Sequence, residues 1–251
     1  TILGECRSSG VAGYASRIGI VRLNDEFDPV GKPTLLDLGG TYGNTALSFN
    51  AEDARLLSSG GRLLIIFSDT IGSTLDWGSW RVFVAELNCS GDSFEVSGME
   101  AITSFPRASP FRREKNWVPF DYLGHLLFSY SLSPHRVFFL KRGEGACEEV
   151  YSSDPDIYWN LGELRGGTPA LPLDSERYLA FFHSSKPMQS VHSQGCTMPH
   201  YFFGAYTFSS KPPFHILSIS PEPIIGQGFY SGPDYKPYWH PVRVVFPCGF
   251  L

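Results

Sequence analysis

The stretch Gly166-Gly167-Thr168-Pro169-Ala170, followed by the apolar run Tyr178-Leu179-Ala180-Phe181-Phe182-His183, decides the predicted fold. Glycine has no Cβ, so a glycine-rich turn lets the backbone approach a ligand closely. The apolar run predicts a buried strand that ends in an ionisable side chain. We therefore expect the strand to carry His183 toward the place where the glycine turn points.

Two other segments have a similar layout. The charged cluster Glu52-Asp53-Ala54-Arg55 precedes the apolar run 62–68, and Glu114-Lys115-Asn116-Trp117 precedes the apolar run 126–131. Each cluster thus stands beside an apolar strand. Three such clusters predict one polar site at the centre of a radial β architecture.

Short strands dominate the rest of the chain. Most of the apolar stretches are rich in β-branched or aromatic residues and are bounded by turn residues. They are 17–23, 62–68, 81–87, 126–131, 136–140, 178–183, 201–208, 215–219 and 242–246. Only 50–57 has weak helical character, and it is too short to anchor a helical core. Strand pairs that recur without close identity predict a propeller of diverged blades, with a β-sandwich as the alternative.

Composition sets the limits on class and partner. The chain has 251 residues, 42% of them hydrophobic, with 26 glycines and 19 prolines, which suits many short strands joined by turns. Its net charge of −5 gives no reason to expect nucleic acid, which needs a basic stripe. No apolar run reaches the length of a membrane-spanning helix, so we expect no membrane span within this chain.

The compartment is left open by the sequence. Five cysteines (Cys6, Cys89, Cys147, Cys196 and Cys248) form no CxxC pair and no zinc spacing, so no metal site is predicted. Asn88-Cys89-Ser90 fits the N-glycosylation pattern, which is short enough to occur by chance. The start of the chain lacks a signal peptide's basic and apolar regions, and it also lacks methionine, so we expect a fragment or a trimmed chain.

Each candidate residue also has an ordinary structural interpretation. The cluster Glu52-Asp53-Ala54-Arg55 would form a local ion pair in a solvated loop. His183 would be a hydrogen-bonded core histidine, Arg165 would cap a carbonyl, and Tyr206 would pack in the core or at an edge. Taken singly, none of these residues decides between structure and function.

Taken in order, the motifs resemble glycoside hydrolase family 130 from about Arg17 to the C-terminus. The resemblance rests on Glu52-Asp53-Ala54-Arg55, Arg81-Val82-Phe83-Val84-Ala85, Lys115-Asn116-Trp117-Val118-Pro119-Phe120, Gly167-Thr168-Pro169-Ala170, Leu179-Ala180-Phe181-Phe182-His183, Gly204-Ala205-Tyr206, Pro221-Glu222-Pro223-Ile224 and Val244-Val245-Phe246-Pro247-Cys248-Gly249. That family contains β-mannoside phosphorylases and hydrolases on a five-bladed β-propeller, and a related group consists of β-1,2-mannosyltransferases.

The resemblance implies a role for each matched residue. Asp53 matches the family's general acid, which passes its proton through a sugar hydroxyl, although Ala54 replaces the motif's proline. Arg81 resembles an arginine that contacts phosphate or carboxylate, and His183 resembles a histidine that faces phosphate. The candidates for substrate or phosphate binding are Arg55, Arg81, Lys115, Asn116, Arg165, His183 and Tyr206.

The departures from the family pattern bear on the reaction. Leu132-Ser133-Pro134-His135 stands where the phosphorylases carry His-Arg-Pro, so one charge-assisted donor for phosphate is lost. No residue can be assigned as the carboxylate base that would activate water. The first-blade Asn-Pro motif and the last strand after Phe246-Pro247-Cys248-Gly249 are missing, which predicts an incomplete terminal blade.

The sequence therefore predicts an all-β, five-bladed propeller over residues 1–251, a single domain truncated at one or both ends. The expected function is to cleave or form β-mannosidic bonds of an oligosaccharide in a central pocket, with inorganic phosphate as a candidate co-substrate and no other cofactor. Two alternatives stay open: a β-mannosyltransferase that uses a nucleotide sugar or sugar 1-phosphate, and a non-catalytic glycan-binding propeller.

Overall fold

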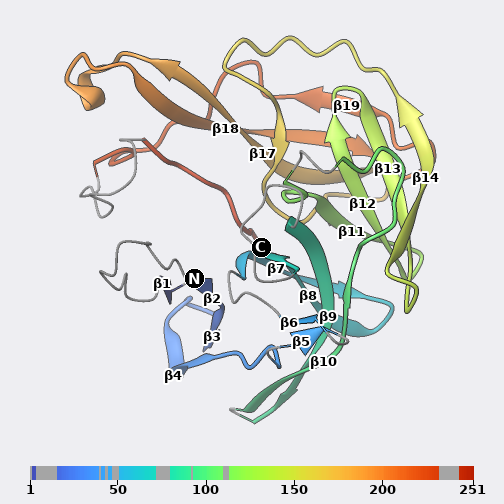
Figure 1. Ribbon diagram of the computed structural model, residues 1–251. Coiled ribbons are helices and arrows are strands. Elements are labelled where there is room, and N and C mark those ends of the chain that lie inside the picture. The colour runs from blue at the N-terminus through green and yellow to red at the C-terminus, as the bar shows by residue number, and fades with distance from the viewer. Residues whose placement is uncertain are drawn as a thin grey trace. The chain divides into compact units, whose positions relative to one another are not determined.

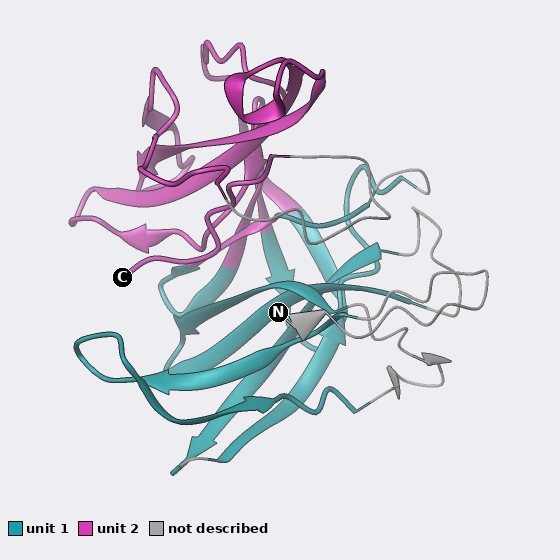
Figure 2. Cartoon of the chain, turned by 90° about the vertical axis from the view of Figure 1, so that its left-hand side faces the viewer, with its two compact units in different colours: residues 1–116, 121–126, 139–148 teal, residues 117–120, 127–138, 149–251 magenta. Residues whose placement is uncertain are grey.

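The computed structural model describes residues 2–3, 16–39, 41–42, 45–46, 51–71, 80–91, 93–109, 113–231 and 243–251. The chain divides into two compact units (Figure 2). Unit 1 contains residues 1–116, 121–126 and 139–148, and unit 2 contains residues 117–120, 127–138 and 149–251. The described chain is built almost wholly of strands joined by turns (Figure 1), which confirms the predicted all-β class.

Unit 1 contains a four-stranded antiparallel sheet in the order β10-β9-β8-β7. Its strands are β7 (Glu52–Ser59), β8 (Arg62–Thr70), β9 (Trp80–Ser90) and β10 (Ser93–Ala101). Residues 64–70 of β8 are all buried, and the rings of Phe67 and Phe83 stack at 5.3 Å between centroids. This continuous burial makes β8 the central strand of the core of unit 1.

Smaller strand pairs complete the described part of unit 1. The hairpin of β3 (Gly19–Leu23) and β4 (Pro29–Leu35) is antiparallel, as are two short pairs. These short pairs are β1 (Ile2–Leu3) with β2 (Ser16–Arg17), and β5 (Thr41–Tyr42) with β6 (Thr45–Ala46). Ile18 and Leu36 pack on the same core cluster as Phe67 and Phe83.

A second four-stranded sheet has the order β11-β12-β13-β14. Its strands are β11 (Val118–Tyr122), β12 (His125–Leu132), β13 (His135–Lys141) and β14 (Ala146–Ser153). Within unit 2, the Trp117 ring meets Phe128, Tyr130 and Phe138 edge-on at 5.1 to 5.6 Å between centroids. These buried aromatic rings form part of the hydrophobic core of the unit.

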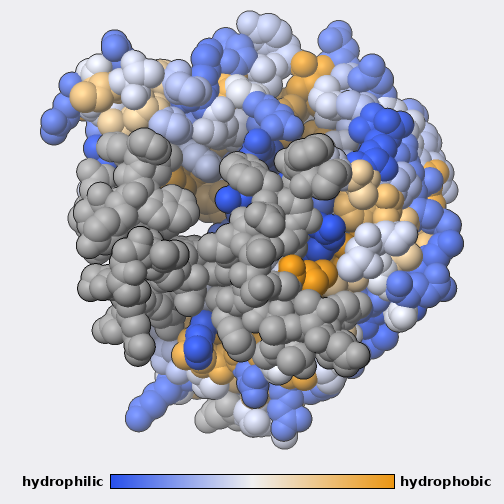
Figure 3. Space-filling view, in the orientation of Figure 1, coloured by the Kyte–Doolittle hydropathy of each residue, from blue (hydrophilic) through white to orange (hydrophobic). Residues whose placement is uncertain are grey.

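Unit 2 also contains the longest hairpin of the described chain, β17 (Arg177–Met188) with β18 (Met198–Ser209). The strands β15 (Arg165–Gly166) and β16 (Leu171–Pro172) pair with β17, and β19 (Ile216–Ile219) pairs with β18. A short 3-10 turn, η2 (Val191–Ser193), connects β17 to β18. On the face shown in Figure 3, hydrophilic residues cover most of the described surface and hydrophobic ones form small separate patches.

Most of the predicted strands are confirmed, with two corrections. The stretches 62–68, 81–87, 126–131, 136–140, 178–183 and 201–208 lie inside β8, β9, β12, β13, β17 and β18. The weak helical character noted over 50–57 does not produce a helix, because residues 52–59 form β7. The strand expected over 242–246 is wrong where the structure describes it, since Arg243 makes a single bridge to His200 and 244–246 are irregular. The five blades stay a prediction.

The glycine-rich turn approaches the chain's own backbone. The amides of Gly167 and Thr168 both donate to the carbonyl of Phe181, at 3.0 and 3.2 Å. A Cβ built on Gly167 would lie 2.8 Å from the Phe181 oxygen and 2.8 Å from Cγ of Pro247. Glycine at 167 therefore permits close packing of β17 and the C-terminal segment.

We expect Gly167→Ala to lower the free energy of unfolding by about 1 to 3 kcal/mol, because the added methyl group overpacks this contact. Urea unfolding of both proteins measures the difference. Gly249→Ala is the matched control, since nothing lies within 4 Å of a Cβ at that position. An equal effect of the two substitutions would contradict the packing role of Gly167.

Candidate functional site

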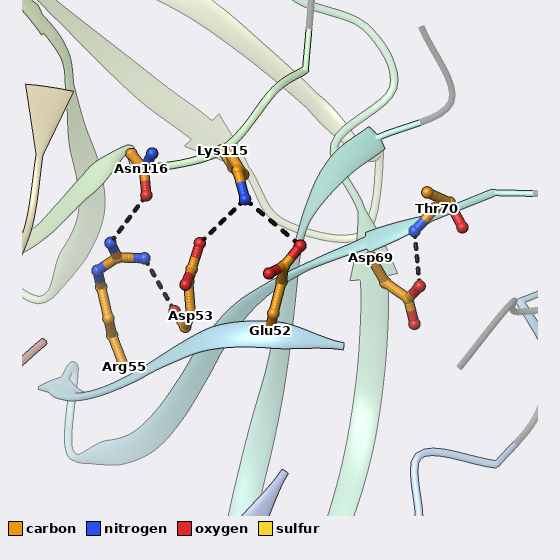
Figure 4. Close-up of polar contacts among 7 residues, drawn as sticks. All are labelled: Glu52, Asp53, Arg55, Asp69, Thr70, Lys115 and Asn116. Atoms are coloured by element: carbon orange, nitrogen blue, oxygen red, sulfur yellow. Dashed lines mark hydrogen bonds and ion pairs between the residues drawn. The ribbon is translucent and has the colours of Figure 1, made fainter. Parts of the chain in front are cut away.

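The start of strand β7 is irregular, and this irregularity brings the carboxylates of Glu52 and Asp53 to the same side of the strand. Glu52 pairs with Ser68 and Arg55 pairs with Ile66, with a register shift between these pairs. Asp53 has φ of 58°, in the left-handed region. Successive side chains of a regular strand point to opposite faces, so Glu52 and Asp53 would diverge. The irregularity instead lets both reach Lys115 (Figure 4).

Lys115 lies between the two carboxylates. Its Nζ is 3.4 Å from Oε1 of Glu52 and 3.5 Å from Oδ2 of Asp53. The three side chains are 19 to 22% exposed, so the group is mostly buried but reachable. The same Nζ lies 5.1 Å from the centre of the Trp80 ring, which adds a cation–π contact.

Arg55 and Asn116 extend this group through hydrogen bonds. Arg55 is only 3% exposed; its Nη1 donates to the carbonyl of Asp53 at 2.9 Å, and its Nη2 donates to Oδ1 of Asn116 at 3.4 Å. Asn116 also has a positive φ, 65°. We call Glu52, Asp53, Arg55, Lys115 and Asn116 the carboxylate–lysine cluster. Two non-glycine residues in the left-handed region within one cluster are a feature of strained functional sites.

Burial changes the proton affinity of Glu52. Desolvation raises the pKa of its carboxyl above the ordinary value, and the nearby Asp53 charge acts in the same direction. The ammonium of Lys115 opposes this shift but does not cancel it. Glu52 therefore keeps its proton to a higher pH than an exposed glutamate. The sequence motif predicted no role for Glu52, although its place beside Asp53 was the available signal.

Arg81 occupies the same sheet as the cluster. It stands opposite Asp69 in the pairing of β8 with β9, and its Nη1 donates to the carbonyl of Trp80 at 2.8 Å. Asp69 is 1% exposed and accepts a 2.6 Å hydrogen bond from the amide of Thr70 (Figure 4). The structure thus keeps Arg81 next to a buried carboxylate on the neighbouring strand.

The remaining candidates, Arg165, His183 and Tyr206, belong to unit 2. Arg165 and His183 face each other across the pairing of β15 with β17. Arg165 is 55% exposed and its Nη2 lies 2.9 Å from Glu163, whereas His183 is buried and stacks on Tyr201. Tyr206 is 1% exposed, and burial raises the pKa of its phenol. Tyr206 and His183 therefore contribute to packing in unit 2.

His135, in the segment that departs from the family pattern, is a core residue. It is 1% exposed, and its Nε2 lies 2.9 Å from Oγ of Ser129. Burial lowers the pKa of the imidazole to about 4, so the ring is neutral at pH 7. A neutral, enclosed imidazole cannot replace the arginine that holds phosphate in the phosphorylases.

The structure also describes most of the cysteines and the asparagine of the glycosylation pattern. Cys89, Cys196 and Cys248 are exposed and Cys147 is buried, all as free thiols, while Cys6 lies outside the described residues. Asn88 is exposed, and its amide donates to Oγ of Ser97 at 2.9 Å. In the described ranges no three or more His, Cys, Asp or Glu side chains are grouped as a metal site, and no helix has the length and apolarity to cross a membrane.

Sequence comparisons do not assign the chain to a known group. No protein-family model matches the sequence, and no curated protein matches it.

Proposed function

We propose that the chain is a carbohydrate-active protein that cleaves or forms β-mannosidic bonds, on a five-bladed propeller formed by residues 1–251. The observation that carries this proposal is the carboxylate–lysine cluster. It sets two adjacent carboxyl groups around one ammonium, on a strained strand. Breaking a glycosidic bond requires a carboxylic acid that protonates the leaving oxygen, and such a pair supplies one.

Asp53 is the general acid in this proposal, acting through a sugar hydroxyl. Lys115 and Arg55 fix its position, because one contacts its carboxylate and the other its backbone carbonyl. Glu52 adds a second carboxyl group next to the first, and burial raises its pKa. The resemblance to glycoside hydrolase family 130 is the reason for proposing mannosides as substrates. The carboxylate–lysine cluster is the reason for proposing acid catalysis.

A sugar acceptor is the second candidate, in a β-mannosyltransferase that takes a nucleotide sugar or a sugar 1-phosphate as donor. The surroundings of the basic side chains favour transfer to a sugar over phosphorolysis. Lys115 is shared by two carboxylates, Arg165 lies beside Glu163, and His135 is neutral and buried. A phosphate dianion needs several charge-assisted donors that are not already neutralised.

A screen with three arms tests the proposal. The protein is incubated with β-linked manno-oligosaccharides alone, with the same glycans plus phosphate, and with nucleotide sugars or sugar 1-phosphates plus a mannoside acceptor. Free mannose, mannose 1-phosphate or an elongated glycan identifies hydrolysis, phosphorolysis or transfer. Glycan binding without any product would assign the non-catalytic alternative, and neither binding nor product would reject the proposal.

Free phosphate should bind weakly, with a Kd of about 1 mM or higher, because the cations identified above already have anionic neighbours or are buried. Isothermal titration calorimetry with inorganic phosphate at pH 7 measures this affinity. Tight and saturable binding would show that other groups compensate for the arginine lost near Ser133, and it would restore phosphorolysis as the leading reaction.

A further inference from the structure

A serine–histidine pair lies at the connection between β17 and β18, and neither residue is among the candidates for sugar chemistry. Oγ of Ser190 is 2.7 Å from Nε2 of His200. The other ring nitrogen of His200, Nδ1, is 2.9 Å from the carbonyl oxygen of Met198. Ser190 directly precedes η2, and His200 lies near the start of strand β18.

The two contacts of His200 fix the position of its proton. A carbonyl oxygen only accepts hydrogen bonds, so Nδ1 of His200 carries the hydrogen and donates it to Met198. In the neutral ring Nε2 then has a lone pair, and the hydroxyl of Ser190 donates to it. A hydroxyl that donates to an imidazole, which a third group orients, is the arrangement of an activated serine nucleophile.

Further hydrogen bonds hold Ser190 in place, and the two residues of the pair differ in burial. The amide of Ser193 donates to Oγ of Ser190 at 3.2 Å, while the amide of Ser190 donates to Oγ of Ser193 at 2.9 Å. His200 is only 2% exposed and meets the Tyr230 ring edge-on at 5.9 Å, whereas Ser190 is half-buried. The imidazole is thus mostly buried, and Ser190 is the partly exposed member of the pair. In Figure 1 the connection, coloured orange, lies at the end of the hairpin away from β19.

A second serine–histidine pair in unit 2 shows the contrast. Oγ of Ser129 and Nε2 of His135 are 2.9 Å apart, but both residues are 1% exposed in the aromatic core. Nothing from solution can reach that hydroxyl, so the pair serves packing. Ser190 differs because the residue is partly exposed, whereas Ser129 is fully enclosed.

We propose that Ser190 is a nucleophile that takes the acyl group of an uncharged, short-chain carboxylic ester, with His200 as its base. The ring of Tyr230 meets the imidazole of His200 edge-on at 5.9 Å between centroids and offers an aromatic contact to a small, uncharged acyl group. Oγ attacks the ester carbonyl carbon as its proton passes to Nε2. The carbon–oxygen bond to the alcohol breaks, and the alcohol leaves with that proton. Water, deprotonated by His200, then releases the carboxylic acid and restores Ser190.

The test uses p-nitrophenyl acetate and a fluorophosphonate on the whole chain, followed by intact-mass measurement and peptide mapping. We expect a burst of about one equivalent of p-nitrophenolate and one phosphonyl group on Ser190. Ser190→Ala should abolish both signals. His200→Gln should slow labelling by about 100-fold, because the base is lost while Ser190 stays.

Ser210→Ala is the matched control, since that exposed hydroxyl donates to the carbonyl of Ser175 and has no imidazole partner. It should leave the labelling of Ser190 unchanged. Absence of label on Ser190 in the folded wild-type protein overturns the proposal. Labelling of His200→Gln at the wild-type rate overturns it equally, and circular dichroism of each variant shows that the fold is kept.

Discussion

Asp53→Asn is expected to reduce turnover by about 100-fold or more, because asparagine keeps the shape of the side chain but has no acidic proton. Lys115 retains its contact with Glu52 in this variant, and Arg55 still donates to the backbone carbonyl at position 53. The loss therefore reports on proton transfer rather than on collapse of the cluster. It is measured as kcat on the substrate that the screen identifies, with thermal unfolding recorded alongside.

Two further variants sharpen this result. Asp174→Asn is the control, because this exposed carboxylate pairs with Arg177 in the other unit and should leave turnover within about twofold. Glu52→Gln separates the two acids of the cluster. If Asp53→Asn retains near-normal turnover while Glu52→Gln loses it, Asp53 is removed from the acid role and Glu52, whose pKa burial raises, takes it.

The strands could be predicted from the sequence where burial is continuous. The prediction failed where the pairing between strands decides the local structure. Residues 64–70 are all buried, and the apolar run 63–67 that begins this stretch is visible in the sequence. In β7 the letters Glu-Asp-Ala-Arg-Leu-Leu suit a helix, yet burial alternates along Arg55, Leu56 and Leu57 with a period of two. Pairing with β8 imposes that alternation, because the register sets which side chains face the core.

For the segment after residue 242, the sequence predicted a strand that the described residues do not form. Val-Arg-Val-Val-Phe has strong β propensity, but a ladder also needs a partner strand with unpaired amides and carbonyls. Arg243 makes one parallel bridge to His200, and residues 244–246 join no strand. Propensity describes how side chains fit a sheet, and it cannot supply the partner.

The candidate site was predictable in its residues and not in its geometry. The charged motifs at 52–55 and 115–116 were visible, and the structure places them in contact. The register shift at Asp53 depends on pairing between β7 and β8, so no local pattern shows it. Ser190 and His200 are ten residues apart with no motif between them, and only the closure of the β17–β18 hairpin brings them together.

Acid should destabilise the fold through His135, and this is the second large effect that we expect. The pKa of the imidazole is about 4 in the folded protein and about 6.5 in an unfolded chain. Between these values the unfolded chain binds a proton that the folded protein excludes. The contribution of His135 to stability is therefore complete above pH 6.5 and is lost as pH falls toward 4, by about 3 kcal/mol in all.

Urea unfolding at several pH values between 7 and 4 measures this loss, followed by tryptophan fluorescence. His135→Gln should flatten the pH dependence by about 3 kcal/mol, because glutamine can bond to Ser129 but does not titrate. His192→Gln removes an exposed imidazole instead and should keep the wild-type slope. If His135→Gln and the wild-type protein lose stability equally on acidification, the buried neutral imidazole is not the cause, because no other histidine was changed in that comparison.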